Sequence, residues 1–191
     1  MLKAVGQVLF SSGLQNPKFT AGEKKAQDYE IRTYHPAKWV STTLSGMQGE
    51  EHLKTGFRRL FNYIQGNNKN KIKVDMTAPV TCHVVPRRRP GVRVSVHHLL
   101  LPARGASGQP PRTQRGRGVC GGQKGDHRLR LTGGFSNENM KREELLKLLE
   151  SLKRDGVEFV DNPYYTAGYD SPFKLTNRRN EVWVLKNAEN Q

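Results

Sequence analysis

The side chains able to act as nucleophiles or to bind a metal are few in this chain of 191 residues. Its two cysteines, Cys82 and Cys120, form neither a C-x-x-C metal motif nor a disulfide framework. The sequence contains no phosphate-binding loop of the P-loop type, no G-x-S-x-G motif and no evident pair of catalytic carboxylates. These features predict a protein that is not an enzyme.

Six histidines remain as candidate metal ligands. Three of them, His97, His98 and His127, lie in an arginine-rich segment between Arg87 and Arg130. His52 falls on a predicted helix and His83 in a predicted strand, where we interpret them as an ordinary solvated residue and an ordinary strand residue. His35 stands directly before Pro36, at a predicted turn. It is therefore the histidine that most merits attention.

The first half of the chain carries strand and helix patterns that would position these residues. "DYEIRTY" (28–34) and "KWVSTTL" (38–44) are rich in β-branched and aromatic residues and predict two antiparallel strands joined at His35 and Pro36. "NKIKVDM" (70–76) alternates in the same way and favours a further strand. Between them, residues 50–66 predict a helix with one apolar stripe: Leu53, Phe57, Leu60, Phe61 and Ile64.

The second half repeats this order. Residues 136–156 predict a helix, with Ser136 as the N-cap, Gly156 just past the end and a stripe of leucines. Short strands follow, the last over Glu181–Lys186, where Arg178, Arg179 and Glu181 indicate a structural ion-pair turn. Strands, helix and strands thus occur twice, which hints at an internal duplication. The pattern predicts an α+β fold with a largely antiparallel sheet.

Five stretches carry a family resemblance: "YEIRTYHPAKWVST", "TGFRRLFNYIQGNN", "KVDMTAPVT", "LKRDG" and "PYYTAGYDSPFKLTNRRNEVWVLK". Together they resemble the SOUL haem-binding family, and the resemblance covers about residues 28–85 and 133–187. It implies a distorted antiparallel β-barrel flanked by two helices and built from two pseudo-repeats. It further implies non-catalytic binding of haem or a related tetrapyrrole. We accordingly expect residues 28–187 to form a single domain after a polar lead-in, 1–27.

The resemblance also implies site residues. Haem requires apolar walls, cations for two propionates and, optionally, an axial ligand. Matching the family's motifs gives Lys54 and Lys174 for the propionates and Phe57 as an apolar wall. The histidine proposed as iron ligand in SOUL relatives corresponds to Thr33 here, and His35 lies two residues further on. The alternatives are that His35 is an exposed turn histidine and that both lysines are ordinary surface charges.

The arginine-rich segment from Arg87 to Arg130 departs from the family. Residues 86–132 hold 11 of the 32 Lys and Arg residues and one of the 17 Asp and Glu residues, so most of the net charge of +15 lies there. Permitted codons for this stretch, read one nucleotide forward, can encode alternating strands and an acidic, Pro-rich loop. We therefore predict that 87–130 is an out-of-frame translation, that two barrel strands are missing from it, and that it is disordered.

Two other interpretations of this segment are a solvated loop and an RNA-binding arm. An arm that binds RNA needs aromatic side chains on which bases can stack, and none lies between Arg87 and Arg130. We therefore expect no nucleic-acid partner.

Residues 145–159, "LLKLLESLKRDGVEF", resemble a BH3 segment, which makes binding to a Bcl-2-family protein in cell-death control the alternative function. Packing of the same leucine stripe on the domain's own sheet is the simpler explanation.

The N-terminal apolar run is too short to span a membrane. We expect a cytosolic protein, with a weak amphipathic leader leaving mitochondrial association as a second option.

Sequencing the transcript tests the frame hypothesis. We expect nucleotide insertions or deletions flanking the codons for residues 87–130. An uninterrupted frame that encodes the arginines as printed would refute the hypothesis.

Overall fold

The structure is a computed structural model that describes residues 13–25, 28–35, 37–46, 50–86, 92–100, 119–121, 125–133, 137–170, 174 and 177–187. Two helices and nine strands lie within these ranges. In chain order they are β1 (Phe19–Lys25), β2 (Tyr29–Tyr34), β3 (Lys38–Gly46), α2 (Glu50–Ile64), β4 (Val80–Pro86), β5 (Val92–Leu100), β6 (Val119–Gly121), β7 (Gly125–Gly133), α3 (Glu138–Arg154), β8 (Phe159–Gly168) and β9 (Arg179–Lys186). Both predicted helices are confirmed.

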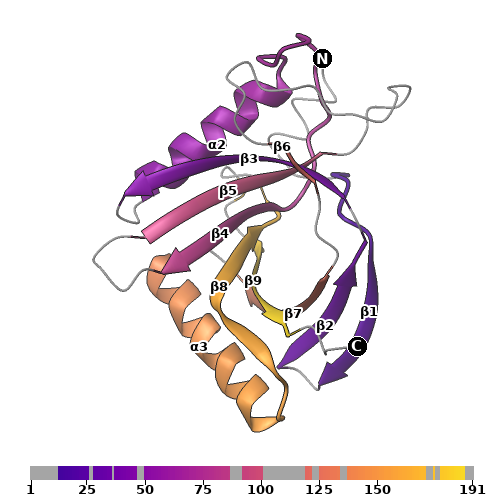
Figure 1. Cartoon of the computed structure of the whole chain (residues 1–191), viewed down its shortest axis with the longest axis vertical. Coiled ribbons are helices and arrows are strands. Elements are labelled where there is room, and N and C mark those ends of the chain that lie inside the picture. The colour runs from indigo at the N-terminus through magenta and orange to yellow at the C-terminus, as the bar shows by residue number, and fades with distance from the viewer. Residues whose placement is uncertain are drawn as a thin grey trace.

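All the described strands belong to one curved sheet, in the order β1-β2-β7-β9-β8-β4-β5-β3-β6 (Figure 1). Every pairing between these strands is antiparallel, so the predicted α+β class is confirmed. The order also reveals the duplication. β3-α2-β4-β5 and β7-α3-β8-β9 are two copies of one unit, and they meet where β4 pairs with β8.

The closed barrel expected from the resemblance is not observed among the described strands. The sheet order ends at β1 on one side and at β6 on the other, so these two strands are its edges. The sheet also begins earlier than predicted. β1 lies within the segment interpreted as a polar lead-in, 1–27, and pairs with β2 from Phe19↔Tyr34 to Lys25↔Tyr29.

The prediction that the arginine-rich segment lacks strands is wrong for three parts of it. β5, β6 and β7 all fall within or overlap residues 87–130, and β5 pairs along its whole length with β3. The physical reason is a pattern that the arginine content obscured: Val92, Val94 and Val96 alternate with Arg93 and Ser95, as β-branched residues do in strands. The rest of the segment lies outside the described residues.

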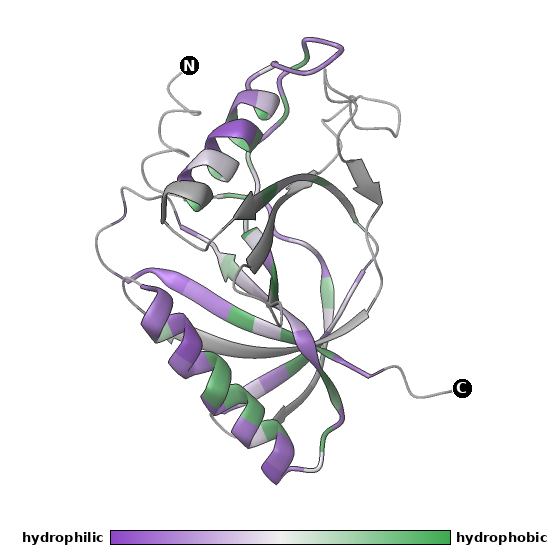
Figure 2. Ribbon diagram, turned by 60° about the vertical axis from the view of Figure 1, so that its left-hand side comes forward, coloured by the Kyte–Doolittle hydropathy of each residue, from purple (hydrophilic) through white to green (hydrophobic). Residues whose placement is uncertain are grey.

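Each helix covers one half of the same face of the sheet. Beneath α2 lies a core of buried residues: Val40, Leu44, Leu60, Tyr63 and Ile64. Beneath α3, Leu148 and Leu152 have no exposed surface and pack with Tyr29 and Val184. Figure 2 shows hydrophobic residues along the side of α3 that faces the sheet. The leucine stripe that resembles a BH3 segment is therefore part of the domain's own core.

The ends of α3 follow capping chemistry, with one change from the prediction. Asn137, and not Ser136, is the N-cap, and its side chain accepts a hydrogen bond of 2.8 Å from the backbone N–H of Met140. Gly156 follows the helix with a φ of +65°, as predicted for the residue just past its end. Neither helix is long and apolar enough to cross a membrane, within the part of the chain described.

The strand predicted over residues 70–76 is not formed. This segment is an irregular loop in which the side chain of the fully buried Asn68 bonds both the backbone N–H and the carbonyl of Ile72. The Asn68 amide donates to the carbonyls of Tyr63 (3.0 Å) and Ile72 (2.6 Å) and accepts from the Ile72 N–H (3.1 Å). A local side chain has thus replaced strand pairing.

Candidate functional site

His35 lies directly after β2, in the turn where the sequence placed it. Its backbone N–H donates to the carbonyl of Lys18 at 2.9 Å, which fixes the turn against the start of β1. Its ring is exposed, and Nε2 shares a hydrogen bond of 3.1 Å with the hydroxyl of Thr20. The ring is therefore oriented by one partner and accessible from solvent.

Lys54 and Phe57 lie one turn apart on α2. The ring of Phe57 is half-buried and stacks on Phe61, with centroids 6.2 Å apart and an interplanar angle of 16°. Phe61 in turn packs against the core beneath the helix. Lys54 is exposed. The helix thus presents a supported, partly accessible aromatic surface beside a lysine.

Lys174 lies in the connection between β8 and β9. Its ammonium pairs with the carboxylate of Asp170 at 2.7 Å, and about a third of its side chain is exposed. Asp170 also accepts a hydrogen bond from the backbone N–H of Arg179. The position of Lys174 is therefore set by the hairpin that begins β9.

The predicted site residues thus stand on three separate elements, each with a partner of its own. His35 is held by Thr20, Phe57 by Phe61, and Lys174 by Asp170. Among the described residues, no group of three or more His, Cys, Asp or Glu side chains is arranged to hold a metal ion.

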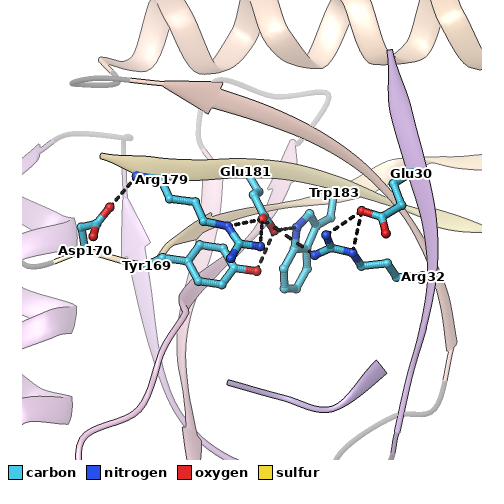
Figure 3. Close-up of polar contacts among 7 residues, drawn as sticks. All are labelled: Glu30, Arg32, Tyr169, Asp170, Arg179, Glu181 and Trp183. Atoms are coloured by element: carbon cyan, nitrogen blue, oxygen red, sulfur yellow. Dashed lines mark hydrogen bonds and ion pairs between the residues drawn. The ribbon is translucent and has the colours of Figure 1, made fainter. Parts of the chain in front are cut away.

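A buried carboxylate forms the densest polar cluster in the described structure (Figure 3). Glu181 on β9 is 1% exposed. One of its carboxylate oxygens accepts from the guanidinium of Arg179 at 2.8 and 2.5 Å. The other accepts from the Tyr169 hydroxyl at 2.6 Å and from the indole N–H of Trp183 at 2.9 Å. The predicted ion pair of Arg179 with Glu181 is therefore present, but both residues lie within β9 and not in a turn before the last strand.

Arg32 brings β2 to this cluster. Its guanidinium lies 3.8 Å from the Glu181 carboxylate and forms a second ion pair with Glu30 at 2.6 Å. It also lies 4.1 Å from the centroid of the Phe19 ring, a cation–π contact. Arg32 is only 7% exposed, so this cation and Glu181 are both largely removed from water.

An aromatic row crosses the sheet on the face opposite the helices. The rings of His83 and Tyr165 are 4.8 Å apart, those of Trp183 and Tyr34 5.1 Å, and those of Tyr34 and Phe19 5.5 Å. Tyr165 pairs with Trp183 in the β8–β9 register, so the His83–Tyr165 pair and the Trp183–Tyr34–Phe19 group are neighbours in the sheet. His83, interpreted from sequence as an ordinary strand residue, is one end of this row.

Burial alters the ionisation of the tyrosines in this region. It raises the pKa of Tyr169, and the negative charge of Glu181 raises it further. Burial likewise raises the pKa of Tyr34 and Tyr165 and, in the core beneath α2, that of Tyr63. On the other face, burial raises the pKa of the Cys82 thiol to about 11, so this cysteine is protonated at neutral pH.

The sequence contained part of the signal for the Glu181 cluster. Alternation in "YEIRTY" places Glu30, Arg32 and Tyr34 on one face of a strand, and alternation in β9 does the same for Glu181 and Trp183. Charged residues that share a strand face with large aromatic residues indicate a buried ion pair. Which strands face each other cannot be derived from either pattern alone.

Comparison with known proteins defines the family. A family model described as SOUL heme-binding protein matches residues 14–185. The chain belongs to the SOUL family. It is 38% identical to heme-binding protein 2 of Homo sapiens, over 97% of this chain and 90% of that protein. It is 35% identical to heme-binding protein 2 of Mus musculus (92% and 88%) and 30% identical to heme-binding protein 1 of Xenopus laevis (87% of each).

Solved structures support the fold of this SOUL-family chain. A structure titled SAV2435 bound to tetraphenylphosphonium has a TM-score of 0.51 and 9% identity, over 84% of this chain and 94% of that one. A hydrolase from Listeria innocua has a TM-score of 0.54 and 8% identity, over 84% and 92%. At these identities the likeness concerns the fold alone.

Alkaline titration tests the burial of the tyrosines. We expect Tyr34, Tyr63, Tyr165 and Tyr169 to stay protonated in the folded protein above about pH 10, where an exposed phenol ionises. Because their folded pKa values are raised, the folded state keeps its full stability below about pH 10 and loses stability as the pH rises further. Ultraviolet difference absorbance of phenolate, read beside circular dichroism, measures both. Ionisation of all six tyrosines near pH 10 in a protein that is still folded would contradict the structure.

Proposed function

We propose that this chain binds haem or a related tetrapyrrole without catalysing a reaction, and that it acts as a carrier or buffer in the cytosol. Membership of the SOUL family and the names of its relatives support the ligand class. The observation that carries the proposal for this chain is the half-buried ring of Phe57, which stacks on Phe61 and lies one turn from Lys54.

In the proposed site, a tetrapyrrole lies against α2. Phe57 provides a flat apolar contact for the macrocycle. Lys54 offers a cation to one propionate. Burying part of the macrocycle against Phe57 supplies binding energy, and the cation orients the macrocycle through its propionate.

Lys174 is proposed to bind the second propionate. Its ion pair with Asp170 is partly exposed, and such pairs contribute at most about 1 kcal/mol. A propionate can therefore share the ammonium at little cost, while Asp170 keeps the lysine in place.

His35 is proposed as the axial ligand of the iron. Its ring is exposed, and the Thr20 hydroxyl holds one ring nitrogen. A hydrogen bond from the second ring nitrogen to a neighbour is the usual way in which a metal-binding histidine is oriented.

The alternative, capture by a Bcl-2-family protein, is disfavoured by the position of α3. A partner's groove would have to take up Leu148 and Leu152, which have no exposed surface in the folded domain. Binding through this stripe requires α3 to leave the sheet, so we retain tetrapyrrole binding as the proposed function.

Haemin titration of the full chain, followed at the Soret band, tests this proposal. We expect Phe57→Ala to weaken binding by roughly tenfold or more through lost apolar contact, and Lys174→Ala by up to about fivefold through one lost ion pair. His35→Ala should shift the Soret maximum of the bound form, because it removes the ligand of the iron. Lys147→Ala is the matched control, since Lys147 is an exposed lysine on α3.

A chain that leaves the Soret band of haemin unchanged would refute the function. Binding that is unaffected by Phe57→Ala and Lys174→Ala would refute the site while leaving the function intact. An unshifted Soret maximum in His35→Ala would show that His35 does not bind the iron.

A further inference from the structure

The loop that follows α2 is a built structure and not a loose connection. Asn68 is fully buried and makes the three hydrogen bonds to Tyr63 and Ile72 given above. The backbone N–H of Val74 donates to the carbonyl of Ile64 at 2.8 Å, which returns the chain to the end of the helix. Residues 66–74 therefore keep a fixed shape.

This fixed loop presents an apolar side chain to solvent. Ile72 is 46% exposed and, with Phe19 and Leu146, is one of three exposed large hydrophobic residues in the described structure. Asn68 holds both the N–H and the carbonyl of Ile72, so these hydrogen bonds position the backbone that carries the exposed side chain. Lys71 has a φ of +54°, a left-handed backbone that the same turn stabilises.

The surroundings of Ile72 are cationic. Lys69, Lys71 and Lys73 are exposed, and so are Arg58 and Arg59 on α2. From Leu53 to Val74 the sequence holds six Lys and Arg residues and no Asp or Glu. The counterpart helix α3 instead mixes both signs, with ion pairs Glu138–Lys141 and Glu144–Lys147. A run of cations without a carboxylate thus occurs on α2 and its loop, where it ends before the exposed Asp75, and does not occur on α3.

We propose that the loop 66–74, with the adjoining cations of α2, docks on anionic lipid surfaces, with Ile72 inserted among the acyl chains and the lysines at the headgroups. Clusters of four to eight cations attract anionic headgroups, and each cation near the surface adds to the binding. An adjacent apolar side chain strengthens binding by entering the interface. The loop lies at the end of the molecule opposite α3 (Figure 1), so contact with a membrane leaves the rest of the domain in solvent.

Two features favour a lipid surface over a nucleic acid. A branched aliphatic tip has no role in binding phosphates, whereas it gains by leaving water at a membrane interface. Proteins that bind single strands place aromatic side chains beside their cations, and the segment 66–74 contains none. The geometry therefore points to a surface that offers negative charge and hydrocarbon together.

Cosedimentation of the full chain with phosphatidylcholine vesicles, with and without phosphatidylserine, tests the proposal. We expect binding only to vesicles that contain phosphatidylserine, reversed by high salt. The double variant Lys71→Glu/Lys73→Glu should weaken it by roughly tenfold or more, and Ile72→Asp by about tenfold.

Two variants at the opposite end of the molecule are matched controls. Lys147→Glu/Lys153→Glu makes the same change of charge on α3, and Leu146→Asp alters a side chain that is 50% exposed there. Both should bind like the unaltered chain. Equal losses in the loop variants and the controls would overturn the proposal, as would binding to phosphatidylcholine alone.

A third result would also overturn it. If duplex or single-stranded RNA binds, and if Lys71→Glu/Lys73→Glu abolishes that binding while Ile72→Asp does not, the surface is a nucleic-acid site. Haemin titration is independent of all these outcomes, so the lipid proposal and the proposed function stand or fall separately.

Discussion

The buried carboxylate of Glu181 is the interaction on which the described sheet most depends. Removing a charge from water costs several kcal/mol unless hydrogen bonds and opposite charges replace the lost solvation. Here four hydrogen bonds and two guanidinium groups do so. Its partners come from β9, from the residue after β8 and from β2, so these segments must meet in one register for the charge to be tolerated. A slip of one residue would separate Glu181 from Arg32 and from the Tyr169 hydroxyl. Each charge would then keep only the partners on its own strand, Arg179 and Trp183 for Glu181 and Glu30 for Arg32.

The duplicated architecture explains how such a cluster can serve a binding protein. The two β-α-β-β units meet at the β4–β8 pair, and each unit covers the same face of the sheet with its helix. The second unit contains the Glu181 cluster and the connection that holds Lys174 through Asp170. The first unit contributes α2, with Phe57 and the cationic loop. The second unit thus holds Lys174 of the proposed site in place, and the first unit carries Phe57 and Lys54.

Much of this fold was predictable because its patterns are local. Period-two alternation located β2, β3 and β9, and the leucine stripe located α3, since each pattern reports one buried face. Two features misled. Val92, Val94 and Val96 predict β5, but the surrounding arginines hid that signal. Residues 70–76 alternate without forming a strand, because Asn68 supplies local hydrogen bonds that no pattern of hydrophobicity encodes.

The candidate site was less predictable than the fold. Motif matching named Lys54, Phe57 and Lys174, and His35 was named because it lies two residues after the motif's histidine position. Their local partners, Thr20, Phe61 and Asp170, come from packing and turn geometry. Arg32 and Glu181 illustrate the general limit. Each lies at an inward strand position, but their meeting depends on the order β2-β7-β9, which joins segments from opposite ends of the chain.

Chemical denaturation of Glu181→Gln beside Glu138→Gln tests the central role of this carboxylate most directly. Both changes remove one negative charge, but Glu138 is half-exposed and pairs with Lys141 on the surface of α3. We expect Glu181→Gln to lower the free energy of unfolding by about 3–5 kcal/mol, and Glu138→Gln by less than about 1 kcal/mol. Equal and small losses in the two variants would contradict the account.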